Sequence, residues 1–508
     1  YAHSKEPVKF SDKDKLEYKP LKVGESWGEL FDCAWFHLSG KYANNDSKKI
    51  YLALDVSGEA LLYSNDGYPL KGFTNGSSAF DTALGKPGKC YYEVTSLIEN
   101  NELNLYLDCG CNDLFGNVKD NGALLYANLV TKNDDIEKLY YDYDLLLVII
   151  FLMCFGLVML YSSSAYSAQV DYKNDMFFFT RQAMIGIIGF IVMFIVSKID
   201  YHLYGAYAKE LFWFSMFLMA LVQTPLGKTV NGARRWIRLP GGLSLQPAEF
   251  TKIAVILFIA YEICLLGQKA KKRDGIKILL GYGLVATLGV FLLTDNLSTA
   301  IIVFAITCIL IFVVHPKTKP FIAGVIVAGI VGIIGIIFLK YTLAKSDNFR
   351  MRRIIAWLNP EANADTDSYQ FLQGLYAIGS GGFFGKGLGN STQKLHAIPE
   401  AQNDMILAVI CEELGVFGAI IILCLFAFML YRLLFIARNA PDLYGALIAT
   451  GIFAHIALQV TLNIGVVTGL LPTTGVTLPF ISYGGTAIVI LLAEMGIALG
   501  ISSKIRLK

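Results

Sequence analysis

Residues 297–315 read LSTAIIVFAITCILIFVVH, a run of 19 residues without a single Asp, Glu, Lys or Arg. A helix of roughly 17 to 25 apolar residues crosses the hydrocarbon core of a bilayer, with all its backbone groups hydrogen-bonded internally. This run therefore predicts a transmembrane helix. Similar runs recur on both sides of it, and ten spans are expected in all, at 144–166, 177–197, 211–226, 245–266, 276–294, 297–315, 320–340, 405–431, 444–465 and 486–502.

Residues 1–143 have a different composition from the rest of the 508-residue chain. They hold 37 of its 84 Asp, Glu, Lys and Arg residues, and no Arg at all. Short apolar runs at 50–56, 60–63 and 103–108 are separated by Gly, Asn and Asp, which is typical of strands and turns. We expect a soluble, all-β, sandwich-like domain over 1–138, a short linker near 134–143, and a polytopic α-helical membrane domain over 144–508.

Lys and Arg residues in short loops mark the cytoplasmic side of a membrane protein. They predict that both termini are cytoplasmic and that the segments 225–243 and 341–404 are external. The cations that support this orientation are Lys269, Lys271, Lys272, Arg273, Lys317, Lys319, Arg432, Arg438, Lys504, Arg506 and Lys508. The external segments nevertheless carry Arg234, Arg235, Arg238, Arg350, Arg352, Arg353, Lys386 and Lys394. These suggest either an anionic ligand or neutralisation of headgroups and local carboxylates, and charge alone leaves both open.

Three of the ionisable residues in or beside the predicted helices are candidates for a functional role. Glu249 and Lys252 are three residues apart on one helical face, just after Pro247, which suits the first turn of a helix. An ion pair in a membrane is costly, so we expect it to face a polar cavity, and a functional role is favoured over a purely structural one. Asp295, between two apolar helices, is either a helix cap or an acid that lines a cavity.

A glycine-rich segment of the large external loop, SGGFFGKGLG at 380–389, is followed by Ser391, Gln393 and Lys394. Glycines allow a ligand to approach the backbone closely, and Lys386 and Lys394 could meet phosphate, although such loops are also common as plain turns.

Asp404 lies where the external loop enters the span 405–431. Burial could raise its pKa toward that of a useful general base, or it could simply be an acid stabilised at a helix N-terminus. Glu400, four residues earlier, would share its face on a continuous helix and compete as the base, whereas Pro399 would keep Glu400 in the loop; Asp404 is favoured. Over 472–485, prolines and glycines around Ser482 interrupt the apolar pattern and indicate a folded external loop shielded by protein.

Several of these stretches, in the same order along 144–508, resemble motifs of the SEDS family (shape, elongation, division and sporulation), which includes FtsW, RodA and SpoVE. They are GLVMLYS at 156–162, NGARRW at 231–236, QPAE at 246–249 with Lys252, SYQ at 368–370, GSGG at 379–382, GKGLG at 385–389, the run from Pro399 to Gly415, Asn463, and LPFISYGG at 478–485. The resemblance implies a peptidoglycan glycosyltransferase that polymerises lipid II into β-1,4 glycan strands at the outer face of the bacterial cytoplasmic membrane. Its implied partners are a class B penicillin-binding protein and other divisome or elongasome proteins.

The resemblance also implies roles for residues. Asp404 matches the essential acid of the family, which suggests it as the base that deprotonates the 4-hydroxyl of the acceptor sugar; attack then displaces undecaprenyl pyrophosphate with inversion. The leaving group needs positive charge, from basic residues or from a divalent cation, Mg or Mn, and no organic cofactor is expected. Family members often have His-Thr-Asp-Phe where this chain has Gln402-Asn403-Asp404-Met405. The candidate substrate or cavity residues are Glu249, Lys252, Arg234, Asp295, Lys386, Ser391, Gln393, Lys394, Glu400 and Ser482.

The N-terminal part resembles the accessory galactose-binding-like domain of family 38 alpha-mannosidases. The resemblance rests on GESWG at 24–28, AWF at 34–36, DVSGEA at 55–60 and DGYPLKG at 66–72. A structural role is favoured over sugar binding. Because SEDS proteins do not ordinarily carry such a domain, both a natural domain of this protein and a fusion are considered.

Two rival functions for the membrane part are a transporter that flips lipid II and a scaffold for division proteins. The net charge of +2 and the dispersed basic residues argue against a nucleic-acid partner.

Overall fold

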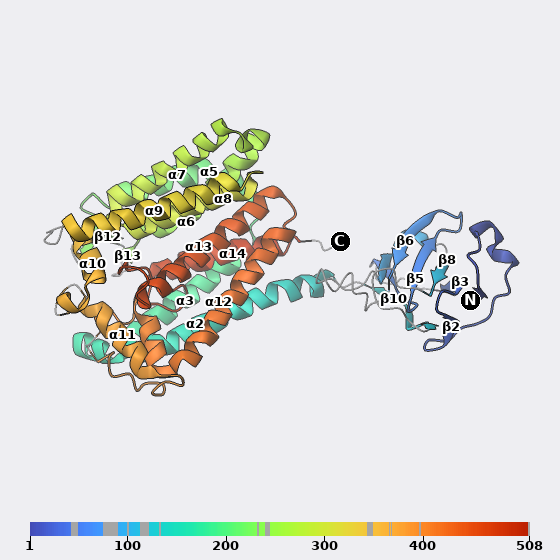
Figure 1. Ribbon diagram of the computed structural model, residues 1–508, viewed down its shortest axis with the longest axis horizontal. Coiled ribbons are helices and arrows are strands. Elements are labelled where there is room, and N and C mark those ends of the chain that lie inside the picture. Colours follow the sequence, from blue (N-terminus) through green and yellow to red (C-terminus); the bar gives the residue numbers. More distant parts are fainter. Residues whose placement is uncertain are drawn as a thin grey trace. The chain divides into compact units, whose positions relative to one another are not determined.

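The computed structural model describes residues 1–41, 49–74, 90–98, 101–111, 121–131, 134–230, 233–238, 244–342, 349–364, 366, 368–395 and 398–505. The chain forms two compact units, Tyr1–Glu137 and Lys138–Lys508, each of which is described by itself. Figure 1 shows the strands of the first unit in blue and the helices of the second in cyan to red.

The first unit is built from antiparallel sheets. A five-stranded sheet has the order β1 (Ala2–Ser4), β3 (Cys33–Lys41), β8 (Glu102–Gly110), β5 (Glu59–Tyr63), β6 (Pro69–Phe73). A three-stranded sheet has the order β10 (Tyr126–Thr131), β4 (Ile50–Asp55), β7 (Tyr91–Glu93), and β2 (Ser26–Glu29) pairs with β9 (Asn121–Ala123). Two 3-10 helices, η1 (Phe10–Lys15) and η2 (Thr95–Leu97), complete the described part of this unit.

The predicted strands are confirmed as β4, β5 and β8. In β8, buried Leu103, Leu105 and Leu107 alternate with more exposed neighbours, because successive side chains of a strand point to opposite faces. They join Leu54 and Leu62 in one apolar core. The first unit therefore forms the all-β, sandwich-like domain that the strand and turn pattern predicts.

The second unit is helical. Its longer helices are α2 (Asp134–Tyr172), α3 (Phe177–Lys198), α5 (Ala208–Leu221), α6 (Pro247–Leu266), α7 (Arg273–Thr294), α8 (Leu297–Val314), α9 (Lys319–Thr342), α12 (Ile406–Asn439), α13 (Leu443–Val467) and α14 (Thr486–Ser502). Shorter elements are α4 (Tyr201–Ala206), η4 (Gly267–Lys271), α10 (Phe349–Leu358), η5 (Glu361–Asn363), α11 (Tyr369–Gly381) and a hairpin of β11 (Gly227–Val230), β12 (Ala233–Arg238) and β13 (Ser244–Leu245).

Each of the ten predicted spans coincides with one of the longer helices. Among the described residues, seven helices are long and apolar enough to cross a membrane. The other three predicted spans fall on α5, α9 and α14, of 14, 24 and 17 residues. Large apolar side chains such as Ile187 and Phe194 of α3 are 62% and 65% exposed, a surface that suits lipid rather than water. The unit is a polytopic membrane protein.

Helix α6 is largely enclosed by other helices. It starts at Pro247, as predicted, and most of its residues are buried, including Lys252. It contacts α5, α7, α8 and α13, so its buried polar side chains meet protein rather than lipid. This placement makes α6 and its neighbour α13 the scaffold of the candidate site.

Two local expectations are wrong. Residues 134–143 are not a separate linker, because they form the first turns of α2. Helix α12 is not continuous either: Gly415 has φ 69°, and a Cβ there would lie 2.2 Å from the oxygen of Phe383. Only glycine fits that conformation and that approach, so α12 breaks there and packs its first two turns against the glycine-rich loop.

Candidate functional site

Asp404 lies in the turn that precedes α12, beside α11, α13 and the loop between α13 and α14. Gln370 of α11 donates from Nε2 to its Oδ1 at 3.3 Å, and Asn463 of α13 donates from Nδ2 to its backbone oxygen at 2.9 Å. Gly475, in the loop between α13 and α14, is close enough that a Cβ there would meet Asp404 Oδ2 at 3.9 Å. Gln370 thus holds the carboxylate and Asn463 holds the backbone of the same residue, beside a glycine that leaves room.

Burial raises the pKa of Asp404 to about 6. The charge of Glu400 raises this pKa further. Three groups lower it: the backbone N–H of Asp404 itself, the Arg353 guanidinium and the Gln370 amide. A carboxylate with a pKa near 6 is still ionised at neutral pH and is a stronger base than a solvated one. The geometry therefore supplies what a general base needs.

Glu400 does not share a helical face with Asp404. It has φ 52°, lies exposed in the turn before α12, and accepts from Asn403 Nδ2 at 2.6 Å. Of the two alternatives, the structure has the one in which Glu400 stays in the loop after Pro399, because α12 begins only at Ile406.

Glu249 and Lys252 form the predicted ion pair, at 2.8 Å, with side chains 15% and 2% exposed. Lys252 also donates to Gln459 Oε1 of α13 at 3.1 Å. Gln459 Oε1 lies 2.9 Å from His455 Nε2, and His455 Nδ1 lies 2.8 Å from a carboxylate oxygen of Glu494 on α14. A buried polar chain therefore runs through three helices of the bundle.

The lysines of the glycine-rich loop are engaged by two buried acids of α12. Lys386 pairs with Glu412 and Lys394 with Glu413, each at 2.7 Å, and both carboxylates have fully buried side chains. Glu412 also accepts from the Ser391 hydroxyl and, at 3.3 Å, from the Gln393 backbone N–H. The four candidates Lys386, Ser391, Gln393 and Lys394 are thus brought together, with their polar groups directed at Glu412 and Glu413.

The remaining candidates hold loops. Arg234 donates from Nη2 to the oxygen of Thr224 at 2.6 Å. Asp295 ends α7 in a left-handed conformation, is exposed, and accepts from Arg235 through its backbone oxygen at 3.1 Å. The helix-cap interpretation of Asp295 therefore fits better than the cavity interpretation. Ser482 Oγ accepts from Leu478 N–H at 2.9 Å and closes the turn before α14. The side chain of Arg350 lies outside the described residues.

Several functional candidates were not assigned from the sequence. Gln370 and Asn463 stood in the quoted motifs but had no role, and His455, Gln459 and Glu494 were read only as parts of apolar spans. His455, Gln459 and Asn463 are spaced four apart, so they form one polar stripe along α13, and that periodicity was the available signal.

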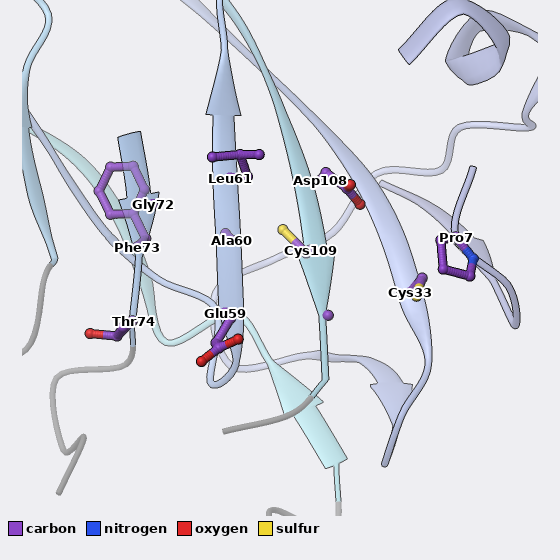
Figure 2. A pocket seen from close by; sticks show the side chains of 11 residues that line it. Pro7, Cys33, Glu59, Ala60, Leu61, Gly72, Phe73, Thr74, Asp108 and Cys109 are labelled. Carbon is purple, nitrogen blue, oxygen red and sulfur yellow. The ribbon is translucent and has the colours of Figure 1, made fainter. Parts of the chain in front are cut away.

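The first unit has a cavity of about 460 Å³ on the five-stranded sheet. Figure 2 shows Glu59 and Leu61 of β5, Asp108 of β8 and Cys33 of β3 around it. Burial raises the pKa of Asp108. Thr74 and Gly110 line the same cavity close to where the described residues end, at 74 and 111. A structural role for this unit, favoured over sugar binding, stays a prediction.

Comparison with known families divides the chain at the same place. A family described as "Cell cycle protein", the FtsW/RodA/SpoVE family, matches residues 143–507. A second, described as "Alpha-mannosidase, jelly roll domain", matches residues 1–141.

The similarity to curated relatives extends over almost the whole length of those proteins. "Probable peptidoglycan glycosyltransferase FtsW" of Geobacter sp. (strain M18) is 38% identical over 373 residues, which are 72% of this chain and 98% of that protein. "Stage V sporulation protein E" of Bacillus subtilis (strain 168) is 41% identical over 366 residues, 71% of this chain and 96% of that protein.

Solved structures share the helical fold at 24% identity. One comes from work titled "Structural coordination of polymerization and crosslinking by a peptidoglycan synthase complex". Its TM-score is 0.58, and the match covers 71% of this chain and 97% of that chain. The rod shape determining protein RodA of Thermus thermophilus has a TM-score of 0.51 and matches 72% of this chain and 97% of its own.

Proposed function

Because the chain belongs to the FtsW/RodA/SpoVE family and is a membrane peptidoglycan glycosyltransferase, we propose that Asp404 is the general base of its reaction. The substrate is lipid II, and the carboxylate takes the proton of the acceptor sugar 4-hydroxyl as that oxygen attacks the anomeric carbon of the donor. The bond from the anomeric carbon to undecaprenyl pyrophosphate breaks with inversion. The observation that carries this proposal is the held, part-buried carboxylate of Asp404, whose pKa burial raises to about 6.

The departing pyrophosphate requires positive charge nearby. Arg353 of α10 is the best-placed cation, because it acts on the Asp404 carboxyl and also donates from Nη1 to the oxygen of Thr473 at 3.3 Å. Among the described residues no group of three His, Cys, Asp or Glu side chains could hold a metal ion. Mg²⁺ is commonly held by one or two carboxylates together with substrate phosphates, so a divalent cation at the pyrophosphate stays a proposal, and no step is assigned to it.

The partner follows from the same chemistry. A polymerised strand has to be crosslinked, and the solved complex with the same fold is described as coordinating polymerisation with crosslinking. We assign this chain a class B penicillin-binding protein as its partner within the divisome or elongasome. The similarity to FtsW and to stage V sporulation protein E favours a role in division or sporulation.

Asp404 must face the outer side of the cytoplasmic membrane for this reaction, with both termini cytoplasmic. The loop that contains Lys272 is then cytoplasmic as well. An impermeant thiol reagent added to intact cells should leave a cysteine at position 272 unlabelled and should label one at position 400.

Purified full-length protein mixed with lipid II separates the three candidate functions. A polymerase yields glycan strands without another enzyme. A transporter moves lipid II across vesicle membranes without lengthening it, and a scaffold does neither. Strand synthesis supports the proposal, and its absence from a folded protein that binds lipid II contradicts it.

A further inference from the structure

The buried pair of His455 and Glu494 lies outside the proposed chemistry. Both side chains are almost fully buried, at 2% and 1% exposure, on α13 and α14. Polar groups so deep in a membrane bundle are costly unless they are paired, and they usually serve a purpose. Their hydrogen bonds show what the pair orients.

The amide of Gln459 has only one workable orientation. Its nitrogen donates to the backbone oxygen of Thr477 at 3.1 Å, and a carbonyl can only accept. Its oxygen faces the Lys252 ammonium at 3.1 Å, and an ammonium can only donate. Reversing the amide would break both bonds, so its oxygen is the atom that faces His455.

This orientation fixes the proton positions on His455. Since Gln459 Oε1 accepts, His455 Nε2, 2.9 Å away, must carry a hydrogen. The other ring nitrogen lies 2.8 Å from Glu494, a hydrogen bond only if a proton lies between them. Either an imidazolium meets a carboxylate or a neutral ring meets a carboxylic acid. In both cases the pair is neutral overall, which suits its burial.

The chain of contacts ends at the loop beside Asp404. Gln459 holds Thr477, and one turn along α13, Asn463 Nδ2 donates to the oxygen of Val476 at 2.8 Å and to that of Asp404 at 2.9 Å. Two successive backbone oxygens of the loop are therefore held by one stripe of α13. We propose that the His455–Glu494 pair is a positioning device of the polymerase. It fixes Gln459, which sets Lys252 and the 475–478 loop relative to Asp404.

This inference rests on the proposed function and deepens it. Two substitutions of Glu494 test it, because both replace the carboxyl group by an uncharged group at similar volume. In Glu494→Gln the new amide can donate to His455 Nδ1 while Nε2–H still faces Gln459, so the chain of hydrogen bonds survives. In Glu494→Met no hydrogen bond to His455 Nδ1 remains, and the ring is held through Nε2 alone.

We expect Glu494→Gln to polymerise lipid II within about threefold of the native kcat, and Glu494→Met to lose roughly tenfold in kcat with KM changed less than twofold, since the pair positions groups rather than binds lipid II. If Glu494→Met does not fold, His455→Phe/Glu494→Met serves instead, since replacing a whole buried pair by apolar groups is often tolerated.

Equal kcat for the Gln and Met variants, or native kcat for the folded double variant, overturns the inference. Failure of the native protein to make strands at all contradicts the proposed function instead, so the two outcomes are distinguishable.

Discussion

Asn463 of α13 and Asp404 before α12 are joined by a hydrogen bond of 2.9 Å from the Asn463 side-chain amide to the Asp404 backbone oxygen. The same amide nitrogen donates to Val476 at 2.8 Å. One asparagine thus ties the turn that carries the proposed base to the loop that faces it. The Asp404 side chain stays available for chemistry, because the asparagine holds the backbone and not the carboxylate.

Removing the Asp404 carboxylate should stabilise the protein at neutral pH. The carboxyl titrates near pH 3.8 when solvated but at about 6 in the fold. As pH rises, this carboxyl therefore ionises in the unfolded chain before it ionises in the folded protein. The free energy of unfolding falls between about pH 4 and pH 6, and the full cost of the buried charge is present above pH 6. Asp404→Asn removes a penalty of about 3 kcal/mol, since one pKa unit corresponds to about 1.4 kcal/mol. In detergent its unfolding temperature should exceed that of the native protein by more at pH 8 than at pH 5. A gain that shrinks as pH rises would contradict the assigned titration.

The Glu249–Lys252 pair should show strong coupling. Glu249→Gln or Lys252→Met alone leaves one buried charge without its partner, which costs about 3 kcal/mol in the interior of a protein. The double variant leaves no such charge and should be more stable than either single variant. Thermal unfolding of the four proteins measures this. A double variant no more stable than the worse single one would show that the two side chains act independently.

Lys394 and Glu413 allow a test between structural and substrate roles. Lys394→Met should destabilise by about 3 kcal/mol, because it leaves the Glu413 carboxylate buried without its cation, and Glu413→Gln should restore most of that loss. Lys277→Met is the control, since Lys277 lies 3.9 Å from Asp274 in an exposed pair. It should change stability by less than about 0.5 kcal/mol.

If Lys394 also binds phosphate, the double variant Lys394→Met/Glu413→Gln will be stable and yet have a raised KM for lipid II. An unchanged KM assigns Lys394 to the loop alone.

The N-terminal unit should be dispensable for polymerisation. It has its own apolar core, and the similarity to alpha-mannosidase jelly roll domains covers only residues 1–141. Deleting 1–138 should leave the rate of strand synthesis within about twofold of native, because the proposed site lies wholly in the second unit. Gel filtration in detergent checks that the shortened protein is folded. Lost activity in a protein that passes this check would mean that the two units cooperate.

The sequence predicted the membrane spans well, because each needs only a long apolar run. It also predicted the Glu249–Lys252 pair, since three residues of helix fix that geometry. It could not predict contacts made by distant packing, such as that between His455 and Glu494. The engagement of Lys394 by Glu413 was missed for another reason: the break at Gly415 that brings α12 to the glycine-rich loop gives no signal in an apolar run. Helix α12 starts at Ile406, which places Glu400 in a turn. The position of this start could not be predicted, because helix boundaries are weakly encoded in sequence.

The most direct test of the account compares Asp404→Asn with Glu400→Gln in the lipid II polymerisation assay. Both substitutions replace a carboxylate by an amide of the same shape, and the two acids lie in the same turn, so Glu400→Gln is a matched control. A positioned base contributes roughly a hundred- to ten-thousand-fold in rate. The account predicts that folded Asp404→Asn protein binds lipid II but makes strands at under about 1% of the native rate, while Glu400→Gln stays within about threefold of native. Near-native strand synthesis by folded Asp404→Asn protein would contradict the assignment of Asp404 as the base.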